Sequence, residues 1–137
     1  MEDRTYSLEE ILLRRDRASC ARNLVMECMQ IEAVEDGAMM TRFHNFYLQI
    51  SFSELHPLAV FCFARPISAL DEEDRYKLNC LNLKSIYGAH AVNEDGNCYI
   101  YRAAFWLEGE LNKSRLFEIL DRFSEEANKG FLTITAI

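Results

Sequence analysis

Positive charge is scarce in this sequence. Fifteen Lys and Arg residues stand against 22 Asp and Glu residues, so the 137-residue chain has a formal net charge of -7 at pH 7. Affinity for nucleic acid comes mostly from basic side chains that neutralise phosphates, and this balance therefore argues against a nucleic-acid partner. The one basic concentration is RRDR at 14–17. We interpret it as a solvated helix face, with an anion or partner site as the alternative.

Long apolar runs are missing as well. No window approaches the run of about 18 apolar residues that spans a bilayer, and the first ten residues, MEDRTYSLEE, contain no apolar signal-peptide core. We expect a cytoplasmic protein without a membrane partner. The cysteines are odd in number, widely spaced and without zinc-ligand spacing, so we expect small reduced core residues. They are Cys20, Cys28, Cys62, Cys80 and Cys98.

Motifs for catalysis and cofactors are also absent. The sequence contains no HExxH, no GxSxG and no glycine-rich phosphate loop, and none of its three histidines has a partner by spacing. The acids at 71–74 are expected to fan out around a helix start, and NEDGN at 93–97 lacks the spacing of a calcium loop. We therefore predict no catalytic residue, no metal and no cofactor, and we do not expect an enzyme.

What is present is the composition of a globular domain. Apolar residues make up 50% of the chain and charged residues 27%, without repeats, low-complexity stretches or linkers. A chain of this length can bury a core without metals or disulfides. We therefore expect a single domain over 1–137.

The first half of the chain predicts a helix followed by a strand meander. Apolar residues at helical spacing, with Ser7 as N-cap and Glu10 completing a capping box, indicate one long helix, and a break at 16–19 is the alternative. The pair His44-Asn45 is typical of a two-residue turn between strands. A turn is expected at 35–37 after a short strand, and strands are expected at 38–43, 46–53 and 58–64, the last buried on both faces.

The second half predicts a helix, a hairpin and a closing helix. The helix after Pro66 is expected to begin at Ser68 or Asp71 and to end at Gly88, and one of its faces carries an apolar stripe. A hairpin over 89–109 is expected around the turn Asp95-Gly96, and an amphipathic helix over 114–130 follows it. The tail 131–137 is β-prone, and we expect a last strand or an extended arm. The stripe consists of Tyr76, Cys80, Leu83 and Tyr87.

Two asparagines in the middle of the helix over 68–87 call for compensation. Asn79 and Asn82 lower its intrinsic stability and lie on one face. We expect their amides to bond neighbouring backbone, with contact to a ligand as the alternative. The hairpin register places His90 opposite Tyr101, and we expect these two side chains to pack together.

The whole pattern resembles the YbjN-domain family. The resemblance lies in the meander ending at LAVFCFARP, the helix with Asn79-x-x-Asn82, the hairpin GAHAVNEDGNCYIYRAAF and the closing amphipathic helix. These bacterial proteins are described as candidate sensory-transduction regulators, with a fold like that of type III secretion chaperones. The resemblance implies a non-enzymatic α+β domain that is often dimeric and binds other proteins. We expect an antiparallel sheet of about five strands with helices packed on it, in the order α-β-β-β-α-β-β-α.

The hairpin is apolar on both faces. Tyr99, Tyr101 and Leu107 lie on one face, and Ile100 and Trp106 lie on the other. Helices on one side shelter only one of these sets, and exposed contiguous apolar surface marks an interface. The predicted protein-binding surface is centred on Trp106, Ile100 and Phe61 or Cys62. The alternative is that the long first helix covers the second face.

Two classes of function follow from these observations. The first is a chaperone-like or regulatory binding module, expected to be a homodimer, whose sheet or first helix engages an unknown protein partner. The second is an enzyme or small-ligand sensor with a pocket between the helix over 68–87 and the sheet. That pocket would use Asn79, Asn82, His90 and Tyr101.

Overall fold

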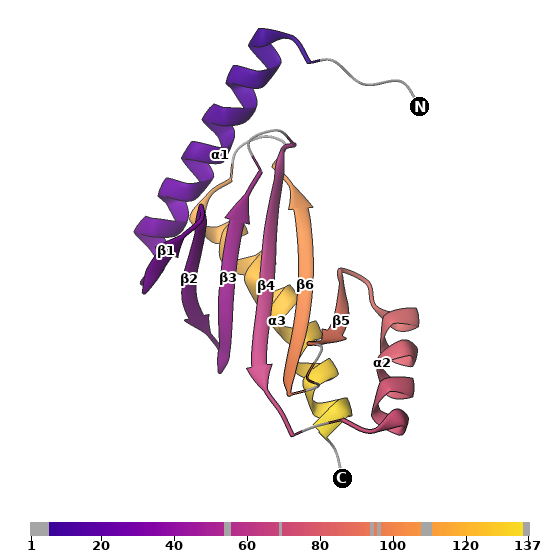
Figure 1. The fold of residues 1–137 in the computed structure, drawn as a ribbon. Coiled ribbons are helices and arrows are strands. Elements are labelled where there is room, and N and C mark those ends of the chain that lie inside the picture. The colour runs from indigo at the N-terminus through magenta and orange to yellow at the C-terminus, as the bar shows by residue number, and fades with distance from the viewer. Residues whose placement is uncertain are drawn as a thin grey trace.

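The protein is a six-stranded antiparallel sheet with helices on one side (Figure 1). A computed structural model describes residues 6–53, 56–68, 70–93, 95, 97–107 and 111–135. The sheet order is β1-β2-β3-β4-β6-β5, so β1 and β5 form its edges. The elements are α1 (Leu8–Cys28), β1 (Ala33–Glu35), β2 (Ala38–Phe43), β3 (Phe46–Phe52), β4 (Leu58–Pro66), α2 (Glu72–Lys84), β5 (Gly88–Val92), β6 (Cys98–Trp106) and α3 (Lys113–Thr135).

This architecture confirms the predicted α+β class but adds to the strand count. The expectation was about five strands, and the sheet has six because the short β1 pairs with β2 from Ala33 to Glu35. The two-residue turn between β2 and β3 is confirmed, since His44 and Asn45 both have positive φ, at 47° and 70°. Among the described residues, no helix is long and apolar enough to cross a membrane.

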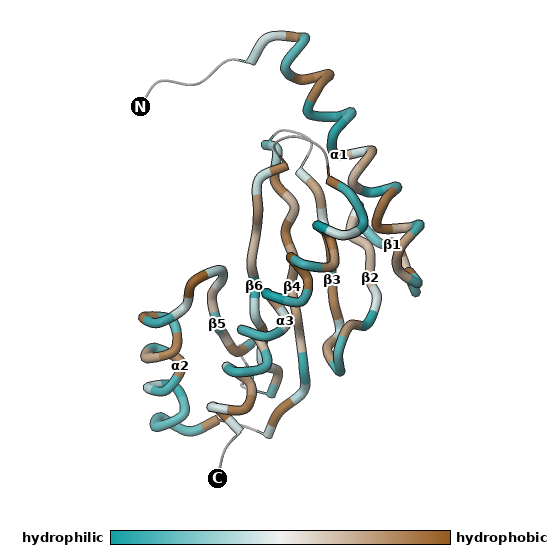
Figure 2. Tube along the Cα trace, turned by 180° about the vertical axis from the view of Figure 1, so that it is seen from behind, coloured by the Kyte–Doolittle hydropathy of each residue, from teal (hydrophilic) through white to brown (hydrophobic). Residues whose placement is uncertain are grey.

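The two faces of the sheet have different surroundings. Helices α1 and α3 lie across one face, α2 lies beside the β5 edge, and the opposite face carries no helix (Figures 1 and 2). Burial follows this layering, because Leu48 and Ile50 of β3 are buried while Tyr47 and Gln49 between them are exposed. We call the helix-covered side the covered face and the other side the open face.

The prediction that β4 is buried on both faces was wrong. Phe61 and Phe63 are fully buried, whereas Val60 and Cys62 are only half-buried. A strand directs alternate side chains to opposite faces, and here only one of those faces is covered. An unbroken apolar run therefore does not distinguish a doubly covered strand from one with an apolar open face.

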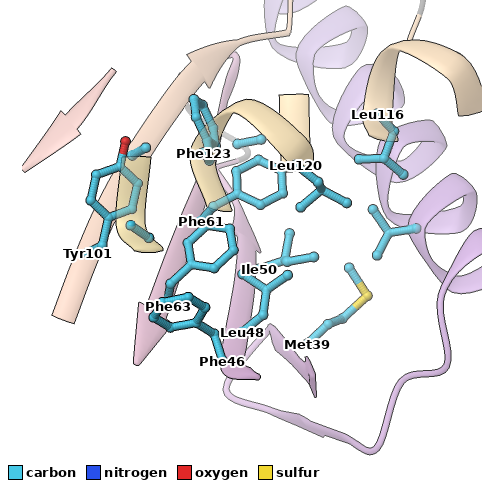
Figure 3. Packing of buried hydrophobic residues seen from close by; sticks show 14 of the residues in the cluster. Met39, Phe46, Leu48, Ile50, Phe61, Phe63, Tyr101, Leu116, Leu120 and Phe123 are labelled. Carbon is cyan, nitrogen blue, oxygen red and sulfur yellow. The ribbon is translucent and has the colours of Figure 1, made fainter. Parts of the chain in front are cut away.

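The core fills the space between the covered face and α3 (Figure 3). Ile50 and Phe61 meet Leu120 and Phe123 there, and the rings of Phe61 and Phe123 lie 5.6 Å apart at their centroids, edge to face. Edge-to-face aromatic contacts of this kind add to the stabilisation from area burial.

Helix α1 is continuous, so the alternative of a break at 16–19 does not apply. Ser7 caps it by accepting a hydrogen bond from the Glu10 backbone N–H at 3.2 Å. Only its second half is packed, through Ala18, Ala21 and Val25. Its first half projects beyond the sheet (Figure 1).

Helix α2 is shorter than expected and packs with a different face. It is capped at Asp71, as predicted, but ends at Lys84 before Gly88, which opens β5. The predicted apolar stripe was wrong, because Leu78 is the buried residue and Tyr76 and Leu83 are 68% and 80% exposed. The helix lies at the sheet edge. The face that packs against the rest of the domain is therefore not the face that carries the predicted apolar stripe.

Helix α3 continues past the glycine that was expected to end it. Gly130 lies inside the helix, which runs to Thr135, so the prediction of a strand or arm for the tail was wrong up to that residue. A side chain at Gly130 would collide with His90 and Tyr99. The glycine thus serves a close approach between α3 and the sheet, and Ile134 beyond it is buried.

Candidate protein-binding surface and the polar cluster beside it

The open face is defined by the pairing of β4 with β6. Cys62 lies opposite Arg102, Ala64 opposite Ile100 and Leu58 opposite Trp106, so all six side chains share this face. Trp106 is 57% exposed, and Ile100 and Cys62 are half-buried. The pairing register thus places three of the four predicted surface residues on one face, over which the described chain has no helix. Ile100 and Trp106 lie at separate positions of this face, about 20 Å apart along β6.

Phe61 does not belong to this surface. It is fully buried on the covered face, against Phe123 of α3 and with its ring stacked near Phe105 at 5.7 Å. Adjacent residues of a strand point to opposite faces, so Phe61 and Cys62 cannot both contribute to one surface.

Charge on the open face is mostly positive. Arg42 and Arg102 lie on it, and strands β2 to β6 direct no Asp or Glu to this side in the described ranges. The edge strand β1 contributes Glu35, which pairs with Ala38 of this face. Arg42 pairs with Glu32 of the chain before β1 at 3.3 Å. Within the described part of the chain, Arg102 forms no ion pair.

The cysteines are less buried than predicted. All five are free, Cys20 is exposed and the other four are half-buried, so none is a core residue. Burial raises the pKa of the Cys62 thiol, and the nearby positive charge of Arg102 only partly opposes this. Cys62 therefore contributes a neutral thiol to the open face at neutral pH.

Asn82 closes the β5 edge. Its amide oxygen accepts from the His90 backbone N–H at 2.6 Å, and its amide nitrogen donates to the His90 carbonyl at 2.9 Å. A side-chain amide here replaces the backbone of a neighbouring strand, which blocks that part of an edge. The predicted amide-to-backbone bonding is confirmed for Asn82. Asn79 is exposed and forms no side-chain hydrogen bond in the described ranges.

Glu126 of α3 ties the start of β5 to the closing helix, and the sequence did not reveal it. Its carboxylate accepts from the backbone N–H groups of Ile86, Tyr87 and Gly88, each at 3.0 Å, and from the Tyr101 hydroxyl at 2.7 Å. Partial burial raises the pKa of this carboxyl, but the four hydrogen bonds together outweigh burial and lower it. No short-range spacing links residue 126 to 86–88, so no sequence signal could have identified it.

His90 and Tyr101 pack together as predicted, with ring centroids 5.1 Å apart. The Nδ1 atom of His90 lies 2.5 Å from the Tyr99 hydroxyl, and burial lowers the pKa of His90, with partial opposition from Glu126. Burial raises the pKa of both Tyr99 and Tyr101 above their ordinary range. Asn82, Tyr99 and Tyr101 therefore form hydrogen bonds within the fold. Their side chains do not converge on a pocket between α2 and the sheet.

The described residues contain no group of three or more His, Cys, Asp or Glu side chains placed to hold a metal ion. The order of elements and the one-sided sheet define an α+β fold of the YbjN and type III secretion chaperone type.

Solved structures with this fold confirm that class at low sequence identity. YbjN of E. coli, a candidate transcription regulator, is 9% identical with a TM-score of 0.61 over 86% of this chain and 89% of its own. The structure of the Yersinia pestis type III secretion chaperone SycH with a fragment of YscM2 gives 12% identity and a TM-score of 0.57 over 82% of this chain and 98% of the other.

A third structure is the HopA1–SchA chaperone–effector complex, with 12% identity and a TM-score of 0.57 over 91% of this chain and 97% of the other. No family model and no curated protein sequence matches the chain. At these identities the likeness establishes the fold, and the predicted resemblance is confirmed at that level.

Proposed function

We propose that this chain is a non-enzymatic, cytoplasmic protein-binding module, chaperone-like or regulatory, that holds a partner protein on the open face of its sheet. The observation that carries the proposal is the exposure of Trp106, at 57%, on the same helix-free face as half-buried Ile100 and Cys62 in the described part of the chain. Contiguous exposed apolar surface of this kind marks interaction sites, and Trp is among the side chains that most often dominate binding energy.

The charge of Arg102 indicates which side chains a partner would need. Arg102 lies opposite Cys62 at the centre of the patch and has no carboxylate partner in the described part of the chain. A partner that presents an Asp or Glu, and an apolar side chain about 13 Å away from it, would satisfy both Arg102 and Trp106. Such complementarity contributes specificity and association rate more than raw affinity.

The structural neighbours support a protein-binding role. Two of them are complexes of chaperones with other proteins, SycH with a fragment of YscM2 and the HopA1–SchA chaperone–effector complex. These neighbours do not supply a residue-by-residue map, so the choice of Trp106 and Ile100 depends on their exposure in this chain.

The test compares three immobilised proteins as baits in a lysate of the native host. Wild type and a Leu83→Ser control, altered at an 80% exposed leucine of α2, should retain the same partner. Trp106→Ser should retain about thirty-fold less, as expected for loss of a hot spot of about 2 kcal/mol. Quantitative mass spectrometry measures the retained proteins. Equal retention by all three baits would remove the open face as the binding site.

We further propose that the module is a homodimer joined through the projecting first half of α1. Leu8 and Leu12 are 72% and 54% exposed and lie one turn apart on the helix. Glu9 and Glu10 precede Arg15, so two antiparallel copies would place acids against a base. Self-complementarity of this kind is what a two-fold symmetric interface requires.

The dimer is tested by light scattering at high protein concentration. Wild type and Leu83→Glu should have the mass of two chains, and Leu12→Glu should have the mass of one, because a buried carboxylate against leucine is costly. Circular dichroism checks that α1 remains helical in the variant. A wild-type protein with the mass of one chain at every concentration would contradict the homodimer.

A further inference from the structure

A groove of about 610 Å³ is lined by residues of α2, of the C-terminal part of α3 and of the edge strand β5. It is on the helical side of the molecule and is separate from the open face. Apolar side chains from both helices line it, among them Tyr76, Leu81 and Leu132. Tyr76 and Leu132 are 68% and 55% exposed, so this apolar lining faces solvent in the isolated chain. Grooves of this volume accommodate small organic ligands.

One buried polar atom opens onto the groove. His90 lines it and is 5% exposed, and its Nδ1 atom is taken by the Tyr99 hydroxyl. Its Nε2 atom has no hydrogen bond to any described residue. Among the described residues, however, no fully buried side-chain nitrogen or oxygen lacks a hydrogen-bond partner. Nε2 is therefore accessible, and His90 is among the residues that line this groove. When Tyr99 donates to Nδ1, the proton of the neutral ring is on Nε2 and points at a ligand.

Basic side chains outnumber acidic ones in the lining of the groove. Lys77, Lys84 and Lys129 line the groove, in a chain whose net charge is -7. Lys77 is paired with Asp74 at 3.7 Å, whereas Lys84 and Lys129 form no ion pair among the described residues. Glu126 is the acid that lines the groove, and its oxygens already accept four hydrogen bonds. Two lysines are thus left for an anion.

We propose that this groove binds an amphipathic monocarboxylate, that is, a straight hydrocarbon chain ending in one carboxylate, as in a medium-chain fatty acid. The hydrocarbon lies along Tyr76, Leu81 and Leu132. The carboxylate accepts from His90 Nε2–H and from Lys84 or Lys129 where the two helices meet. This site is distinct from the protein-binding surface in the proposed function, and its occupancy does not require a partner.

Calorimetric titration with decanoate, below its micellar concentration, tests the ligand class. We expect saturable binding of one decanoate per chain, and much weaker binding of decan-1-ol and decylammonium. The double variant Lys84→Met with Lys129→Met should bind decanoate about ten-fold more weakly, because charge-assisted bonds to the carboxylate are lost. Lys113→Met, at an exposed lysine outside the groove, is the matched control and should bind like wild type. Equal binding of decanoate and decan-1-ol would overturn the assignment of an anionic ligand.

Cysteine footprinting tests the location without any substitution. Cys80 lines the groove and exposed Cys20 lies on α1, so both sites can be followed in one sample. Saturating decanoate should slow alkylation of Cys80 several-fold and leave Cys20 unchanged. Absence of saturable binding, or binding without protection of Cys80, would overturn the site. Trp106→Ser should bind decanoate as wild type does, so failure here and failure of the protein-binding surface are separate outcomes.

Discussion

The single side chain of Glu126 fixes the position of several groups in the fold. It accepts hydrogen bonds from three consecutive backbone groups and from Tyr101, and so joins α3 to the segment that leads into β5. Asn82 makes the complementary connection from α2 to His90 in the same strand. Two polar residues therefore hold the short edge strand where apolar contacts are few.

Replacing Glu126 by Gln is expected to destabilise the protein by about 1–2 kcal/mol at neutral pH, because an amide offers a single acceptor oxygen to four donors. Urea unfolding followed by circular dichroism measures the loss. Glu125→Gln, at the exposed neighbour, is the matched control and should unfold as wild type does. A Glu126→Gln midpoint equal to the wild-type midpoint would show that the four hydrogen bonds contribute nothing net.

The same carboxylate makes stability depend on pH. Its pKa is lowered in the folded state from an ordinary value of 4.5, so its stabilisation is complete above that value. The stabilisation is lost as the pH falls through the lowered folded pKa, where the carboxylate becomes protonated. In Glu126→Gln this contribution is absent, so the difference between wild type and variant should shrink in acid.

At the scale of elements, the end of α3 is the clearest departure from local sequence rules. Lys129-Gly130 has the form of a helix stop, and FLTITAI is rich in β-branched residues. The helix nevertheless continues, because Phe131 contacts Phe46 and Tyr99 edge to face and lies under Arg65, and Ile134 is buried. Burial of this apolar surface outweighs the propensity of the tail.

Ile134→Ala is therefore expected to destabilise the protein by about 2–4 kcal/mol, the cost of emptying a buried apolar site. Leu132→Ala, two residues earlier at a 55% exposed position, should cost less than about 1 kcal/mol. Thermal unfolding of both variants provides the comparison. Equal effects would mean that residues 131–135 do not pack on the sheet as a helix.

At the scale of the whole molecule, the decisive feature is a sheet covered on one side only. The same residue type occurs on both faces, since Ile50 is fully buried under the helices and Ile100 is half-buried on the open face. This pair allows the layering to be tested independently of any partner.

Ile50→Ala is expected to cost about 2–5 kcal/mol, and Ile100→Ala about 1 kcal/mol or less, because only the first leaves a cavity. Chemical denaturation of the two variants measures both values. A large effect of Ile100→Ala would indicate that some part of the isolated chain covers the open face.

The sequence by itself determined the elements whose signals are local. The cap at Ser7, the turn at His44-Asn45, the alternation of β3 and the register that sets His90 opposite Tyr101 all follow from short-range backbone and side-chain preferences, and all are confirmed. The apolar character of both hairpin faces was also visible in the sequence, and it led to the prediction of a binding surface at Trp106 and Ile100, with Phe61 or Cys62 of the strand at 58–64.

Only the tertiary structure decided which apolar face is covered and by what. It placed Phe61 in the core, turned α2 so that Leu78 faces inward, extended α3 beyond Gly130 and joined Glu126 to residues 86–88. Each of these outcomes depends on contacts between segments far apart in the chain, and burial energy summed over such contacts exceeds any local propensity. A pattern of apolar residues shows that a face will be buried, and the packing of distant helices determines which one.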